Sequence, residues 1–322
     1  MAEHQWWIIV AIVLTTLAFA TTVAFNALAA INPGVIFLNS TGDLADKYYF
    51  ILTPAGWTFS IWSVIYIWLI LAILYTWTTL CRKNKSDYVY VRPKVLSFPF
   101  YICLSINFGL NVAWLLLWDR QYVPASTLAL CLICFTLYIC IGASHANLYQ
   151  YLPRMMSSQK LDVWCIRILI HNGLAIYATW CTIAALLNLG STLVYWVGLS
   201  QETTGIICLS VLAFEVVLWA MLEVLVLDRW FRFTLTIWPV VIWALAGSLY
   251  ENWDLTATTC IYSFVLIVIA GCIFIFRIGV FLWRVCNFPL IKNIPATPTR
   301  DDRTWTQLTL RSFNLKNKIQ LR

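Results

Sequence analysis

Long apolar stretches alternate along the chain with short polar segments. Eight of these stretches are long enough to cross the hydrocarbon core of a bilayer, which takes about 20 residues of α-helix. They lie near residues 6–30, 57–80, 97–118, 122–148, 163–188, 205–227, 233–250 and 257–276. The connections at 119–121 and 228–232 are short, so their neighbours should form antiparallel hairpins. The pattern predicts an all-α, polytopic transmembrane helix bundle with eight spans.

The composition supports lipid as the solvent for most of this chain. Hydrophobic residues make up 61% of the sequence and charged residues 11%, against about 45–50% and about 25% in a soluble domain. The 18 Trp and 15 Tyr residues exceed what two interfacial belts usually require. We therefore expect membrane lipids as partners, and some aromatic side chains inside the bundle.

The distribution of basic residues predicts the orientation of the spans. If the N-terminus is cytoplasmic, eight spans place 19 of the 21 Lys and Arg residues on the inner side, leaving Lys47 and Arg120 outside. Basic residues favour cytoplasmic loops, so both termini are predicted to be cytoplasmic. We expect a plasma-membrane or endomembrane protein rather than a mitochondrial one. The net charge of +7 reflects this topology and indicates no nucleic-acid partner.

The polar loops carry two glycosylation acceptor sequences. Asn39 begins Asn-Ser-Thr in the loop 31–52, on the predicted outer side, and Asn84 begins Asn-Lys-Ser on the predicted inner side. Only Asn39 is expected to carry sugar. The segment 285–322 is polar and basic and is predicted to be a flexible cytoplasmic tail.

Few residues suggest catalysis or metal binding. Cys131 and Cys134 form a C-x-x-C pair inside an apolar stretch with no second pair, so we expect small buried or lipid-facing thiols and no metal. His145 and His171 could bind a metal or haem iron or move protons, but we interpret them as an interior hydrogen-bonding pair. No recognisable catalytic motif is present, and we expect no enzyme.

Two acidic residues lie in the sixth predicted span. Glu215 is ten residues into that span, near the middle of the bilayer, where a charge costs roughly 2.5–3.5 kcal/mol on insertion scales. Glu223 follows eight residues later, about 80° away around the helix. The two could form a proton or cation path. Alternatively, a protonated Glu215 bonds a neighbouring helix while Glu223 reaches the inner headgroups.

Aromatic residues surround the start of the second span. The segment 53–66 has the sequence Thr-Pro-Ala-Gly-Trp-Thr-Phe-Ser-Ile-Trp-Ser-Val-Ile-Tyr. In the third span, Asn107 and Asn111 lie one turn apart, with Trp114 and Trp118 on about the same stripe. Amides in lipid require partners, so this stripe faces either protein or a cavity.

Three motifs resemble those of the TspO/translocator-protein superfamily, also called tryptophan-rich sensory proteins. The second helix of that family has the order found here in Pro54, Trp57, Phe59, Trp62 and Tyr66. The Asn-x-x-Trp of its third helix is matched by Asn111 and Trp114, and the pattern of its fifth by Tyr177, Trp180, Ala184 and Asn188. Three further predicted helices follow, which resembles a long eight-helix branch.

The resemblance implies a TspO-like five-helix core over 1–190, three additional helices over 191–284, and a pocket beneath the loop 31–56. The short, five-helix members of the family bind porphyrins and sterol-like or aromatic molecules, so the expected ligand is a flat hydrophobic molecule such as porphyrin, haem or a sterol-like lipid. The residues expected to contact it are Trp57, Phe59, Trp62, Tyr66, Asn111, Trp114, Tyr177, Trp180 and Asn188.

Two other functions stay open. A secondary transporter could be driven by protonation of Glu215. A structural or assembly protein could use the C-terminal helices to dock a homodimer partner or another membrane protein.

Overall fold

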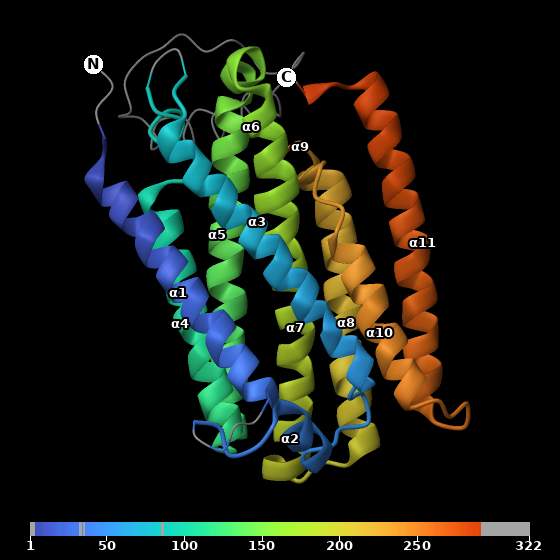
Figure 1. Ribbon diagram of the computed structural model, residues 1–322. Helices are drawn as coiled ribbons and strands as arrows, with labels where there is room; N and C mark the ends of the chain where they lie inside the picture. The colour runs from blue at the N-terminus through green and yellow to red at the C-terminus, as the bar shows by residue number, and fades with distance from the viewer. Residues whose placement is uncertain (1–3, 32–33, 35, 85–86, 291–322) are drawn as a thin grey trace, which may run out of the picture. The chain divides into compact units, whose positions relative to one another are not determined.

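The computed structural model describes residues 4–31, 34, 36–84 and 87–290, and the regular secondary structure of this part of the chain is helical apart from an isolated antiparallel bridge between Lys83 and Tyr88 (Figure 1). Its helices are α1 (Trp6–Ile31), α2 (Thr41–Lys47), the 3₁₀-helix η1 (Gly56–Ser60), α3 (Ile61–Cys81), α4 (Phe98–Asp119), α5 (Val123–Ser158), α6 (Lys160–Cys165), α7 (Asn172–Thr192), α8 (Gln201–Met221), α9 (Asp228–Phe231), α10 (Ile237–Glu251) and α11 (Thr258–Asn287). The predicted tail lies, from residue 291 onward, outside the described residues.

The predicted polytopic bundle is confirmed. Seven helical segments of the described chain are long and apolar enough to cross a membrane: 6–30, 56–81, 98–119, 123–158, 160–197, 201–226 and 258–287. The helix found in the seventh predicted span, α10, has 15 residues and measures about 22 Å at 1.5 Å per residue. That is shorter than the about 30 Å of hydrocarbon; the irregular segment 232–236 precedes it.

Local sequence explains several helix ends. Ser40 caps α2 by accepting a hydrogen bond from the Asp43 amide, while the Asp43 side chain accepts one from the Ser40 amide. Ser200 caps α8 in a similar way through the Thr203 amide, at 3.1 Å. Gly198 has a φ of 82°, a conformation that glycine adopts without strain, and it ends the helical run of α7.

Two spans contain three wide π-turns: η2 (Ile166–His171) before α7, η3 (Leu193–Val197) after α7, and η4 (Leu222–Val226) after α8. A π-turn inserts a residue and so redirects the side chains beyond it. Asn172, which follows η2, donates hydrogen bonds to the carbonyl oxygens of Arg167 at 2.7 Å and Phe233 at 2.8 Å. The π-turn thereby ties α7 to the segment that precedes α10.

The helix α7 occupies the centre of the bundle. It packs against α3, α5, α8 and α10, and its span is 61% buried, the largest share among the seven spans of the described chain. α11 lies at the edge of the bundle beside α8 and α10 (Figure 1). Its span is 17% buried, and many of its apolar side chains are exposed.

The segment 49–60 is held against α10. The Ala55 amide donates to the Gly247 carbonyl oxygen at 3.1 Å, and the Asn252 side chain donates to the Thr53 carbonyl oxygen at 2.9 Å. The Tyr49 hydroxyl donates to Asn252; burial, and then the charge of Glu251, raise the pKa of Tyr49. Residues 1–289 form one compact unit, in which α10 covers the predicted aromatic entrance.

Candidate ligand-binding site

Trp62 lies at the centre of a cluster of aromatic rings. Its ring is nearly parallel to those of Tyr66 and Trp114, with centroid distances of 5.6 and 6.5 Å. Tyr177 and Trp180 approach it at steep angles, at 6.0 and 6.4 Å. The structure therefore brings together side chains from α3, α4 and α7 that the sequence motifs single out, and they pack against one another.

Hydrogen bonds fix the edge of this cluster. The Asn111 amide donates to the Tyr177 hydroxyl at 3.1 Å, and its oxygen accepts from the Asn26 amide at 2.8 Å. Asn111 is 1% exposed, so the two bonds satisfy a buried amide that would otherwise be costly in lipid. Asn26 on α1 was not predicted as a partner, and it lies in the first span among small and apolar residues.

Three of the predicted contact residues lie at the margin of the cluster or outside it. Phe59 reaches it through the Trp180 ring, at a centroid distance of 6.0 Å. Trp57 instead packs edge-on against Trp243 of α10, at 4.9 Å. Asn188 donates to the Ser126 hydroxyl at 2.6 Å, which joins α7 to α5 away from the rings. Their role in ligand contact stays a prediction.

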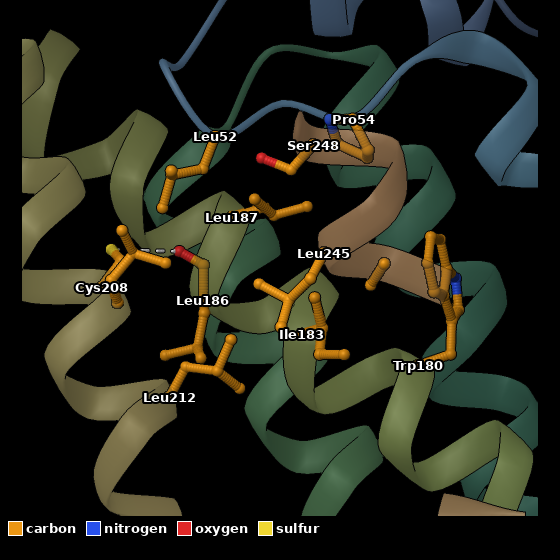
Figure 2. Close-up of a pocket in the computed structure, with 12 residues that line it drawn as sticks. Leu52, Pro54, Trp180, Ile183, Leu186, Leu187, Cys208, Leu212, Leu245 and Ser248 are labelled. Carbon is orange, nitrogen blue, oxygen red and sulfur yellow. Dashed lines mark hydrogen bonds between the residues drawn. The ribbon is translucent and has the colours of Figure 1, made fainter. Parts of the chain in front are cut away.

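A small hollow lies beside Trp180. Figure 2 shows it between α7, α8, α10 and the segment 52–54, with Trp180 at one side and Leu52 and Pro54 above. Its volume is about 40 Å³, which holds about one water molecule and no larger ligand. The predicted pocket beneath the loop is therefore mostly filled by aromatic and aliphatic side chains in this structure.

A much larger cavity lies between α5, α7, α8 and α10. Its volume is about 360 Å³, within the range of roughly 300–1,000 Å³ that small-molecule pockets occupy. It shares Ile183 and Leu212 with the small hollow, so the two spaces are neighbours. The walls include Tyr138 and Gly142 from α5, Ala175, Ala178 and Thr182 from α7, Glu215 and Trp219 from α8, and Trp238 and Val241 from α10.

The cavity opens between α5 and α8. Tyr138 is 52% exposed and Leu218 is 38% exposed, although both line the cavity. Gly142, one turn after Tyr138, is also an exposed lining residue, and a Cβ atom added there would meet nothing within 4 Å. Because these residues lie in the membrane spans, the opening faces lipid.

Glu215 places a carboxyl group in this apolar space. One of its oxygens, Oε2, is buried and has no hydrogen-bond partner in the described chain. The indole nitrogen of Trp219, one helical turn further along α8, is also buried without a partner there. Unpaired buried polar atoms are costly, and these two lie on a cavity wall.

Glu223 has a different environment, although it follows on the same helix. Its carboxylate forms an ion pair with Arg277 of α11 at 2.7 Å, and both side chains are 1% exposed. The Trp238 indole also donates to it, at 2.9 Å. Arg277 was not predicted to lie in the core, because the predicted eighth span ends at residue 276; α11 continues to Asn287. The apolar sequence after Arg277 was the available signal.

The two membrane histidines are stacked together. The His145 and His171 rings are 3.5 Å apart, and the Phe231 ring, which lines the large cavity, stacks 4.1 Å from His145 on its other side. His145 bonds the Thr234 hydroxyl at 2.9 Å and the Ile141 carbonyl oxygen at 2.8 Å. Within the described residues no group of three or more His, Cys, Asp or Glu side chains could hold a metal ion.

Comparison with known proteins gives one match. A family model described as TSPO-like protein matches residues 11–278, a range that contains the aromatic cluster and both hollows. Neither the curated proteins nor the solved structures yield a match.

Proposed function

Because the chain belongs to the TSPO-like protein family, we propose that this multi-pass integral membrane protein binds a small hydrophobic molecule without transforming it. The cavity between α5, α7, α8 and α10 carries the proposal, since about 360 Å³ of mostly apolar space suits an apolar ligand. This volume is near the lower end for ligand pockets, which favours a compact sterol-like or aromatic molecule over a whole tetrapyrrole. Trp180, which belongs to the cluster around Trp62, lines the small hollow that neighbours this cavity.

We infer the orientation of the protein from the charged residues at each end of the bundle. His4, before α1, stacks on Tyr88 of the basic 82–94 loop at 4.1 Å, while Lys47 and Arg120 contact Gln121 and Asp119 at the other end. The richly basic end is the one that cells retain in the cytoplasm. We place both termini there, and Asn39 on the opposite side.

Filling the mouth of the cavity should prevent ligand binding. Gly142→Phe adds a ring at an exposed lining position of α5 and introduces no contact closer than 4 Å at Cβ. We expect binding of a radiolabelled sterol-like or aromatic ligand to protein in nanodiscs to fall by at least about tenfold, because a ring at a lining position takes up space that the ligand needs. Equilibrium dialysis against empty nanodiscs measures the specific fraction.

Gly109→Phe is the matched control for this experiment. Gly109 is an exposed α4 residue where an added Cβ also meets nothing within 4 Å, but it lines none of the cavities described above. The Gly109→Phe variant should bind ligand as wild type does. Equal binding by wild type and Gly142→Phe would contradict the assignment of the ligand to this cavity.

The unpartnered Glu215 oxygen favours a second candidate function, which is proton-coupled transport. A carboxyl group in a lipid-facing cavity can change its charge as a substrate binds, which is the usual role of such residues in transporters. Glu215→Gln should then abolish uptake driven by a pH gradient in proteoliposomes while protein yield is retained. Undiminished gradient-driven uptake by this variant would exclude the candidate.

A further inference from the structure

Some polar groups that line the large cavity have hydrogen-bond partners and others do not. The Thr182 hydroxyl donates to the Ala178 carbonyl oxygen at 2.8 Å and lies 2.6 Å from the Tyr138 hydroxyl. The Thr179 hydroxyl donates to the Ala175 carbonyl oxygen, also at 2.8 Å. The wall atoms left without a partner are therefore Glu215 Oε2 and Trp219 Nε1. A complementary ligand would present a donor to the first and could present an acceptor to the second.

A cation is the donor that suits this carboxyl group best. None of the ion pairs among the described residues includes Glu215, whereas Glu223 on the same helix has Arg277. A carboxylate in a low-dielectric space gains far more from an ammonium group than from a neutral hydroxyl. Within the described residues, the protein supplies a counter-charge to Glu223 and none to Glu215.

Aromatic rings complete the surroundings of such a cation. Tyr138, Trp219, Phe231 and Trp238 all line the cavity. The Trp238 N–H already donates to Glu223, so the face of the Trp238 ring, rather than its N–H, is available to a ligand. Aromatic faces attract ammonium groups, most strongly where water is excluded.

We propose that the cavity between α5, α7, α8 and α10 is a binding site for a hydrophobic organic amine, whose ammonium group pairs with Glu215 and whose apolar body fills the remaining space. The inference rests on the proposed function, because it names the chemical class of the ligand for the same cavity. The lipid-facing mouth at Tyr138 and Gly142 allows a membrane-dissolved amine to enter from the bilayer.

A matched pair of probes tests the role of charge. 4-Phenylbutylamine and 4-phenylbutan-1-ol differ at the head group, and equilibrium dialysis with empty nanodiscs corrects for partition into lipid. We expect wild type to bind the amine more tightly than the alcohol. Glu215→Gln should weaken amine binding by at least about thirtyfold, in line with the loss of one partner of a desolvated charge pair, and leave alcohol binding unchanged.

Two further variants separate charge from folding. Glu215→Asp keeps the carboxylate and should retain part of the amine preference. Glu202→Gln removes an exposed carboxylate in the first turn of the same helix and should bind both probes as wild type does. Equal affinity of wild type for amine and alcohol, or full amine binding by Glu215→Gln, would overturn the proposal. Saturable alcohol binding that Gly142→Phe prevents would then still support the proposed function, whereas saturable binding of neither probe would contradict both.

Discussion

Arg277→Met is expected to lower the thermal stability of the protein more than any other single charge removal in its core. The substitution leaves the Glu223 carboxylate, which is 1% exposed, without its counter-charge. Breaking a buried ion pair by removing one partner costs about 3–5 kcal/mol, because the other charge stays desolvated. Arg277 also donates to the carbonyl oxygens of Phe231 and Arg232, at 3.2 Å each, and these bonds are lost as well.

The measurement is the fraction of detergent-solubilised protein that stays monodisperse after heating, followed by size-exclusion chromatography. We expect the midpoint to fall by roughly 10 °C, if a few degrees correspond to each kcal/mol. Arg92→Met is the control, since the ion pair of Arg92 with Asp87 spans 4.0 Å and Arg92 is 63% exposed. Pairs of this kind contribute little, so this midpoint should stay close to that of wild type.

A double variant shows whether the unpaired Glu223 carboxylate causes the loss of thermal stability. In Glu223→Gln/Arg277→Met neither charge remains, and the amide oxygen introduced at position 223 can still accept the Trp238 N–H. The double variant should therefore recover part of the lost midpoint, although the two carbonyl bonds stay broken. A double variant no more stable than Arg277→Met would show that the ion pair does not explain the loss.

The helical bundle could be predicted from sequence because membrane spans are long apolar segments, and length and composition suffice to find them. Their ends were harder to predict. The predicted eighth span stops at residue 276 because a lone arginine in an apolar run ordinarily marks the membrane interface. In the folded chain, Glu223 from another helix pairs with Arg277 and allows α11 to continue. This pairing depends on tertiary packing, so the local sequence around Arg277 could not predict it.

The candidate site, too, could be predicted from the sequence only in part. The motif residues Trp62, Trp114, Tyr177 and Trp180 do meet, because helices of the expected order bring them together. The large cavity could not be predicted, since its walls include small residues such as Gly142 and Ala178 that leave no hydrophobic periodicity. A hollow between helices depends on how they pack. Glu215 is a wall residue that the sequence did single out, because the free energy cost of a charged side chain in lipid indicated a special environment.

The second large effect is expected at Gly247, where α10 meets the segment that begins the aromatic motif. A Cβ atom added at Gly247 would lie 2.0 Å from the Thr58 hydroxyl oxygen and within 3 Å of its methyl carbon. Thr58 is 0% exposed, so its side chain has little room to move. Gly247→Leu should push η1 away from α10 and break the bond from Ala55 to residue 247 and that from Trp243 to Thr58.

We expect Gly247→Leu to cost about 1–3 kcal/mol, the usual range for overpacking, and to lower the thermal midpoint by several degrees. Chymotrypsin should also cleave at Phe50 or Trp57 faster than in wild type, because the segment 49–60 loses two of its hydrogen bonds to α10. Gly279→Leu is the matched control: Gly279 is exposed on α11 and an added Cβ meets nothing within 4 Å, so neither readout should change.

Thr58→Ala provides the decisive comparison in this experiment. The Thr58 hydroxyl is buried and has no hydrogen-bond partner in the described chain, so removing it alone should cost little. Combined with Gly247→Leu, it removes the atoms in closest conflict and should recover part of the stability and of the protease resistance. If Gly247→Leu is as stable as wild type, or if Thr58→Ala brings no recovery, then close packing of α10 on η1 is not what holds the aromatic segment in place.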